Sequence, residues 1–184
     1  MQHTGTTPFE TERLLCRRFD AGDLADMFRN WCADPAVQRE YGEPVYDDMQ
    51  KAKGLLDEYL GGYNRPDFYR WTIIEKKSGE NIGQIAFCRV WSDCDTAEIE
   101  YCIGQRFWGN GYAGEALAGL IGHVFQTTEF ERLEAYHRAE NVKSGRVLEK
   151  SAMRRTDTVQ SIIREKKDPA GKVCYRIDRS EYPG

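Results

Sequence analysis

The chain has 184 residues, of which 40% are hydrophobic and 30% are charged, and its formal net charge is −4. This length is close to that of one ordinary domain with a sizeable core, so we expect a single domain over residues 1–184. The slightly negative net charge gives no excess of positive charge and argues against nucleic acid or an anionic membrane as a partner.

Cysteine and histidine spacing bears on metal binding and on the compartment. Six cysteines are scattered along the chain without a Cys-x-x-Cys pair, and three histidines are well separated. This spacing is typical of reduced thiols and unlike a zinc site, so no metal is expected. No apolar run reaches the length of a membrane span, and the first residues lack the pattern of a signal peptide. We therefore expect a cytoplasmic protein.

Hydrophobic periodicity predicts the elements of the first half of the chain. Residues 14–19 are expected to form a strand, and residues 23–31 a helix with its apolar side chains on one face. A second helix is expected over residues 47–60, where a glycine pair ends it. The stretches 68–76 and 82–91 flank a Ser-Gly-Glu-Asn turn and are predicted to form a hairpin.

The second half continues the alternation of strands and helices. Four elements are expected in order: a strand over 95–104, a helix over 113–125, a strand over 132–137 and a helix that Asn141 can cap. Two last strands, over 156–165 and 173–179, are predicted to close the chain as a hairpin. This order indicates one mixed α/β sheet with helices on both faces.

The most informative segment is Arg-Phe-Trp-Gly-Asn-Gly at residues 106–111, between a predicted strand and a predicted helix. Gly109 and Gly111 lack a Cβ atom and tolerate strained dihedral angles, so a phosphate can approach the backbone there. The following helix offers unpaired N–H groups and the positive end of its dipole. The segment is therefore predicted to bind a phosphate or pyrophosphate.

Two nucleotide-binding motifs can be compared with this loop. A P-loop needs Lys and then Ser or Thr after its last glycine, whereas Tyr112 and Ala113 follow here. Gly114 occupies the third glycine position of a dinucleotide-binding fingerprint. The aromatic pair and Arg106 do not belong to that fingerprint, and the chain upstream is not a βαβ start.

With its continuation Tyr-Ala-Gly-Glu-Ala, this loop resembles the acyl-CoA pyrophosphate loop of the GNAT family, the Gcn5-related N-acetyltransferases. The segment 141–151, with Asn-x-x-Ser and then Val-Leu-Glu-Lys, is similar to the RimJ/RimL-type branch, as are residues 11–14 and 34–37. The resemblance implies a GNAT-like central, mostly antiparallel twisted sheet of about seven strands with about four helices on both faces.

The resemblance also implies acetyl-CoA as the acyl donor and a set of residues that bind it. Backbone N–H groups of the glycine loop would bind the pyrophosphate, with Arg106 beside it. The strand segment 101–103 would pair with the pantetheine arm, and one of its N–H groups would stabilise the oxyanion. The implied binding residues are Tyr101, Cys102, Ile103, Arg106, Trp108, Gly109, Asn110, Gly111, Tyr112, Ala113, Gly114, Asn141 and Ser144.

Asn141 and Ser144 lie three residues apart at a predicted helix start, so they share a face. By resemblance, Asn141 contacts the pantetheine amide, and Ser144 lies near the sulfur, where it can help to protonate the leaving thiolate. The spacing alone fits equally well with a plain helix cap at Asn141 and an ordinary polar residue at Ser144.

Glu98 is the candidate general base, because it shares a strand face with Glu100 and close carboxylates raise each other's pKa. A solvated strand face is the open alternative. An α-amine has an ordinary pKa near about 8, so a weakly placed base would favour N-terminal or small-molecule amines over lysine.

These features together predict an acetyl-CoA-dependent N-acetyltransferase in which a primary amine attacks the thioester directly in a ternary complex. No acyl-enzyme is expected, because Cys102 has no recognisable histidine partner. A non-catalytic acyl-CoA-binding module and a nucleotide-binding protein are the alternatives. The acceptor stays open among a ribosomal-protein N-terminus, an aminoglycoside, a polyamine and an amino acid, and the protein is expected to be a monomer or a homodimer.

Overall fold

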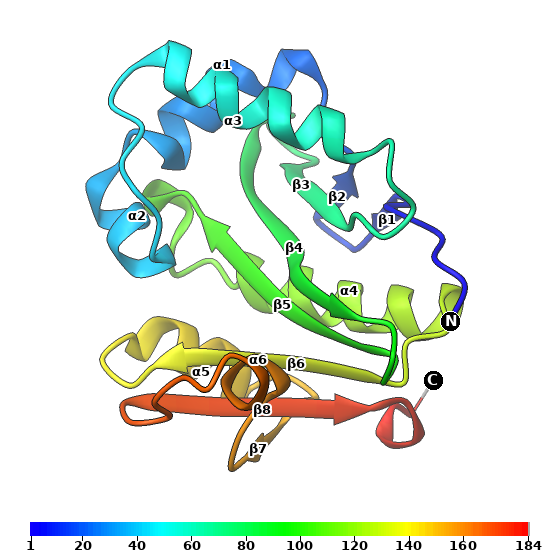
Figure 1. Ribbon diagram of the computed structural model, residues 1–184. Helices are drawn as coiled ribbons and strands as arrows, with labels where there is room; N and C mark the ends of the chain where they lie inside the picture. The colour runs from blue at the N-terminus through cyan, green and yellow to red at the C-terminus, as the bar shows by residue number, and fades with distance from the viewer. Residues whose placement is uncertain (184) are drawn as a thin grey trace. The chain divides into compact units, whose positions relative to one another are not determined.

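The computed structural model describes residues 1–183, and Figure 1 shows the arrangement of their helices and strands. Within these residues the strands form one eight-stranded sheet in the order β1-β2-β3-β4-β5-β6-β8-β7. β5 and β6 are parallel, whereas β1 with β2, β2 with β3, β3 with β4, β6 with β8 and β7 with β8 are antiparallel. The expected mixed, mostly antiparallel fold class is confirmed.

The elements have the following bounds. The strands are β1 (Phe9–Glu10), β2 (Leu14–Arg17), β3 (Arg70–Glu75), β4 (Asn81–Trp91), β5 (Thr96–Ile103), β6 (Arg132–Arg138), β7 (Arg154–Thr156) and β8 (Lys172–Asp178). The helices are α1 (Leu24–Met27), α2 (Pro35–Tyr41), α3 (Met49–Gly62), α4 (Tyr112–Thr127), α5 (Val142–Glu149) and α6 (Gln160–Arg164). The described residues thus hold more helices and strands than the resemblance implies.

The chain divides into two compact units that are interleaved in sequence. The first contains residues 1–3, 87–100 and 117–184, and the second contains residues 4–86 and 101–116. β4, β5 and α4 contribute residues to both. The single domain over 1–184 stays a prediction.

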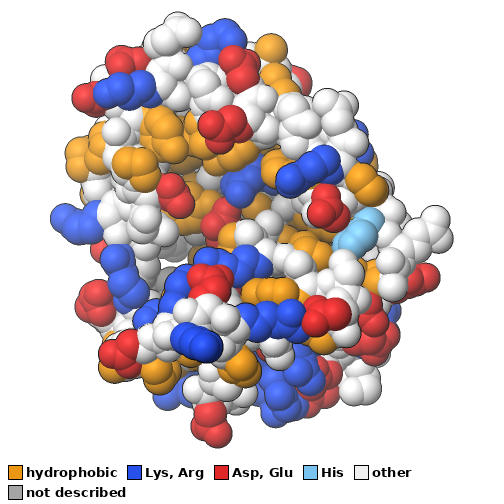
Figure 2. All heavy atoms as spheres, viewed as in Figure 1, with side chains coloured by type: hydrophobic (Ala, Val, Ile, Leu, Met, Phe, Trp, Pro, Cys, Tyr) orange, Lys and Arg blue, Asp and Glu red, His pale blue; other side chains and the backbone are white. Residues whose placement is uncertain are grey.

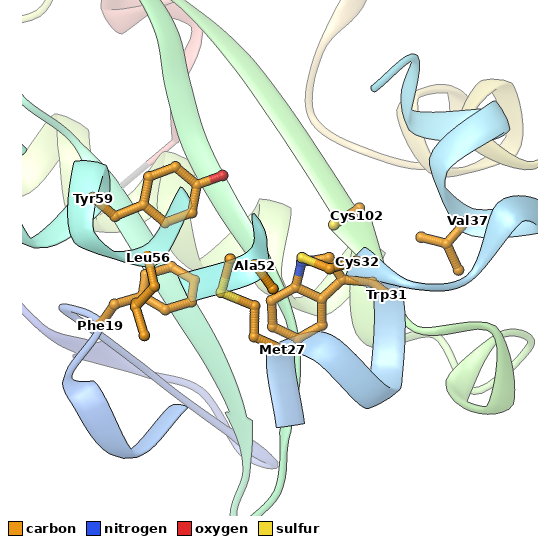
Figure 3. Packing of buried hydrophobic residues seen from close by; sticks show 9 residues of the cluster. All are labelled: Phe19, Met27, Trp31, Cys32, Val37, Ala52, Leu56, Tyr59 and Cys102. Atoms are coloured by element: carbon orange, nitrogen blue, oxygen red, sulfur yellow. The ribbon is translucent and has the colours of Figure 1, made fainter. Parts of the chain in front are cut away.

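The core of the second unit lies where α1, α2 and α3 meet the sheet. The expected helix over 23–31 is present, as a 3-10 turn, α1 and a π-helical turn over Phe28–Cys32. Figure 3 shows side chains of this segment, of α3 and of β5 turned toward one another. The buried cluster consists of Phe19, Met27, Trp31, Cys32, Val37, Ala52, Leu56, Tyr59 and Cys102.

Helix α2 was not among the elements expected from the sequence. The carboxylate of Asp34 accepts a hydrogen bond of 2.8 Å from the N–H of Ala36, and Pro35 occupies the first helical position. Gly42 ends the helix with a φ of +88°. A side-chain cap, an N-terminal proline and a left-handed glycine are all sequence signals of a short helix, but this one has only seven residues in which a periodic pattern can show.

The sequence prediction for the C-terminal hairpin is wrong over most of residues 156–165. Of this segment, Thr156 at the end of β7 pairs with β8, and α6 follows. Val159 and Ile162, which are three residues apart, both pack against Cys174. The segment therefore follows helical spacing, and the alternation of a strand does not hold there.

The surface carries both signs of charge. On the face shown in Figure 2, Lys and Arg side chains are intermingled with Asp and Glu. Arg164 of α6, for example, donates a hydrogen bond of 2.8 Å to Asp93. In the described part of the chain, no helix is both long enough and apolar enough to span a membrane.

Candidate active site

The glycine loop lies between β5 and α4, as the sequence predicts. Gly109 and Gly111 both have a φ of +81°, a conformation that other residues rarely adopt. The indole N–H of Trp108 donates to the carbonyl of Ile103 over 2.7 Å, and the amide of Asn110 donates to the carbonyl of Phe107 over 3.1 Å. Side chains of the loop therefore hold its own backbone in a tight turn before α4.

Arg106 leaves the loop toward the β3–β4 turn. Its guanidinium forms an ion pair with Glu80 and lies over the ring of Phe107, 4.6 Å from the ring centroid. Glu80 also binds Arg29, over 2.8 Å. About half of the Arg106 side chain is exposed, so it stays accessible to an anion. Its position beside a pyrophosphate remains a prediction.

The end of β5 is formed by Tyr101, Cys102 and Ile103, which the resemblance predicts to pair with the pantetheine arm. The register of β5 with β6 covers only Thr96, Ala97 and Glu98. The Cys102 side chain belongs to the hydrophobic cluster of Figure 3. The expectation that no acyl-enzyme forms at Cys102 stays a prediction.

The first turn of α4 contains Tyr112, Ala113 and Gly114. The Tyr112 hydroxyl forms a hydrogen bond with Glu75 at the end of β3. The N–H of Glu115 donates to the carbonyl of Gly111 over 3.0 Å, so the helix begins directly at the loop. The N-terminus of a long helix therefore follows the two glycines, as phosphate binding requires.

Asn141 and Ser144 come together at the start of α5. The Asn141 side-chain oxygen accepts a hydrogen bond of 3.0 Å from the Ser144 N–H, and Asn141 is 9% exposed. The predicted helix cap at Asn141 is confirmed. The contacts of both residues with a thioester donor stay predictions.

Glu98 lies on β5 with only 2% of its surface exposed. Its carboxylate accepts a hydrogen bond of 2.9 Å from the Arg89 guanidinium and a short one from the Ser161 hydroxyl. Arg89 also pairs with Glu165. The alternative interpretation, in which Glu98 lies on a solvent-exposed strand face, is therefore wrong. No sequence signal pointed to its partners, since Ser161 is 63 positions away.

Glu134 faces Glu98 across the parallel register of β5 and β6 and accepts a hydrogen bond of 2.6 Å from the N–H of Gln160. Burial raises the pKa of Glu134, and the charge of Glu98 adds to this, while the N–H of Gln160 and the Arg132 guanidinium oppose it. The folded state thus binds the Glu134 proton more tightly than the unfolded state, and this contribution to stability is lost as the pH rises above the ordinary carboxyl range.

Glu134→Gln is therefore expected to raise the melting temperature at neutral pH, because the amide carries no charge and still offers an acceptor to Gln160. The gain should shrink as the pH falls below the ordinary carboxyl range, where wild-type Glu134 becomes protonated in both states. Thermal melts of both proteins from acidic to neutral pH test this. Glu140→Gln, on an exposed side chain, is the matched control. A gain that does not change with pH would contradict the prediction.

Among residues 1–183, no group of three or more His, Cys, Asp or Glu side chains is arranged to hold a metal ion.

Comparison with known proteins identifies the family. The model of the acetyltransferase (GNAT) domain matches residues 13–154. An uncharacterised N-acetyltransferase p20 of Bacillus licheniformis is 26% identical over 95% of this chain and 97% of its own length. A ribosomal-protein-serine acetyltransferase of Escherichia coli is 29% identical over 61% of this chain and 73% of its own length.

The fold agrees with the sequence comparison. The crystal structure of a GNAT-family acetyltransferase from Bacillus anthracis superposes with a TM-score of 0.78 at 23% identity, covering 95% of this chain and 99% of that one. The expected membership in the GNAT family and its RimJ/RimL-type branch is confirmed by these comparisons. The chain belongs to the GNAT family and is an acetyltransferase.

Proposed function

We propose that this acetyltransferase uses acetyl-CoA as donor and a primary amine as acceptor, either a protein N-terminus or a small-molecule amine. The observation that supports acetyl-CoA as the donor is the pair of glycines with positive φ directly before α4. This geometry suits a pyrophosphate, which binds backbone N–H groups at a helix N-terminus. One relative is a ribosomal-protein-serine acetyltransferase, which makes ribosomal proteins a class of acceptor to test.

In the proposed reaction, the neutral amine attacks the thioester carbonyl carbon within a ternary complex. A C–N bond forms and the C–S bond breaks. The amine loses a proton to a base, for which Glu98 is our candidate, and the CoA thiolate takes up a proton with help from Ser144. A backbone N–H of the segment 101–103 stabilises the oxyanion. Because the amine itself is the nucleophile, Cys102→Ala should leave turnover intact.

Ligand binding and turnover test this proposal in two steps. Thermal shifts with acetyl-CoA, CoA, ATP and NAD should show stabilisation by the two CoA compounds alone. Acetyl-CoA turnover is then measured with N-terminal peptides of ribosomal proteins, aminoglycosides, polyamines and free amino acids. CoA binding without transfer to any of these amines would indicate a non-catalytic acyl-CoA-binding module. Stabilisation by ATP or NAD alone would contradict the proposed donor.

Asn141 offers a test that separates capping from donor binding. Asn141→Ala should lower the stability by about 1 kcal/mol, because the Ser144 N–H loses its acceptor. Asn141→Asp keeps a good cap but loses the side-chain N–H, so it should stay within about 0.5 kcal/mol of wild type. If Asn141 donates to pantetheine, Asn141→Asp binds acetyl-CoA several-fold more weakly. Urea unfolding and calorimetric titration measure both effects, and unchanged affinity in Asn141→Asp would leave Asn141 as a cap alone.

A further inference from the structure

A partly buried carboxylate, that of Glu115, joins the N-terminal part of the chain to the first turn of α4. Glu115, with 17% of its side chain exposed, accepts three hydrogen bonds within the second unit. The donors are the Arg13 guanidinium over 2.6 Å, the Arg13 backbone N–H over 2.8 Å and the Thr11 hydroxyl over 2.5 Å. Glu115 thus fixes the backbone and the side chain of Arg13 at once.

Arg13 uses its remaining donors on the glycine loop. One terminal nitrogen donates to the carbonyl of Asn110 over 3.0 Å, and the guanidinium lies 4.6 Å from the ring centroid of Tyr112. A planar arginine held by a carboxylate on one edge and an aromatic ring on its face presents its other donors in a fixed direction.

The contact with Asn110 sets the orientation of a peptide group in the loop. In a trans peptide, the C=O of one residue and the N–H of the next point in opposite directions. Because the Asn110 carbonyl points to Arg13, the N–H of Gly111 points away from Arg13. Gly111 has a φ of +81°, and a glycine peptide has few steric restraints on its rotation. The arginine supplies the restraint that the glycine lacks.

The charges of Glu115 and Arg13 also favour an anion at the loop. Burial opposes ionisation of Glu115, but hydrogen bonds from Thr11 and Arg13 outweigh it and hold the pKa of Glu115 below its ordinary value. A carboxylate is therefore present beside the helix N-terminus at neutral pH. Arg13 neutralises it, so that it does not repel an anion bound at the loop.

We propose that Arg13 is a positioning residue of the donor site, which directs the Gly111 N–H toward the pyrophosphate of acetyl-CoA through its contacts with Asn110 and Glu115. This inference rests on the proposed use of acetyl-CoA. It adds a residue nearly a hundred positions before the loop to the donor site, and it gives Glu115 a role as the anchor of that residue.

Arg13→Met tests the proposal, with calorimetric titration of acetyl-CoA as the first readout. Affinity should fall about tenfold, because the peptide is no longer fixed and the charge of Glu115 is no longer neutralised by the guanidinium. In turnover, KM for acetyl-CoA should rise similarly, with kcat nearly unchanged. S-acetylpantetheine, which lacks the pyrophosphate, should be used equally well by variant and wild type. Arg13→Lys, which keeps the charge but not the planar fork, should give an intermediate loss.

Arg164→Met is the matched control. Arg164 is exposed to a similar degree, pairs with one carboxylate, Asp93, and lies over one ring, that of Trp91. Its loss should leave acetyl-CoA affinity unchanged. Equal losses with both donors, or unchanged affinity in folded Arg13→Met and Arg13→Lys, would overturn the proposal. Absence of acetyl-CoA binding by the wild type would show, before any variant is made, that the proposed function itself has failed.

Discussion

Replacing Gly109 with alanine is expected to weaken acetyl-CoA binding about tenfold, with only a modest loss of stability. Gly109 has a φ of +81°, and a Cβ atom there would meet no atom of the protein within 4 Å. The substitution therefore adds no clash within the folded chain. It introduces backbone strain of about 1–2 kcal/mol and a methyl group where a phosphate is expected to approach. If the loop relaxes instead, its N–H groups turn away from the ligand.

Gly42→Ala separates the strain from the loss of binding. Gly42 has a φ of +88° at the end of α2, and its Cβ atom would also meet nothing within 4 Å. Both variants should lose a similar amount of stability in urea unfolding, since the strain is of the same kind. Only Gly109→Ala should lose affinity for acetyl-CoA in a calorimetric titration. Equal affinities of the two variants would remove the loop from the donor site.

The structure of the glycine loop was predictable because the signals lie next to one another in the sequence. The glycines at 109 and 111 follow an alternating stretch and precede a helical one, so local rules alone place a strand, a turn and a helix. The cap at Asn141 is local in the same way. Such features depend on a few neighbouring residues and survive in any fold that keeps those neighbours together.

The remaining features depend on residues far apart in the sequence. Arg13 and Glu115 are separated by 102 positions, and nothing in either segment says that the other is its partner. Helix α6 was missed for a related reason. The burial of Val159 and Ile162 on one side depends on Cys174 of β8, which lies in another segment. Tertiary packing overrides weak local preference in a segment of five residues.

Glu98→Ala is expected to lower the free energy of unfolding by about 2–3 kcal/mol, which is large for a single polar side chain. The carboxylate is almost fully buried, and its removal takes one acceptor from the Arg89 guanidinium and one from the Ser161 hydroxyl. Glu165→Ala removes the other partner of the same arginine, on an exposed side chain, and should cost less than about 1 kcal/mol. Urea unfolding of the two variants makes this comparison directly.

Activity of the folded variants then separates the base from a structural carboxylate. If Glu98 accepts the amine proton, Glu98→Gln should lose about 100-fold or more in turnover at neutral pH, corrected for the folded fraction. Part of this loss should be recovered at higher pH, where the amine is already neutral without help from the protein. Glu165→Gln, which alters the same ion-pair network at its exposed end, should keep wild-type turnover throughout. The alternative outcome is that, at every pH, the lost turnover of Glu98→Gln equals its unfolded fraction. The amine would then lose its proton to solvent, and Glu98 would serve only to hold Arg89 and Ser161.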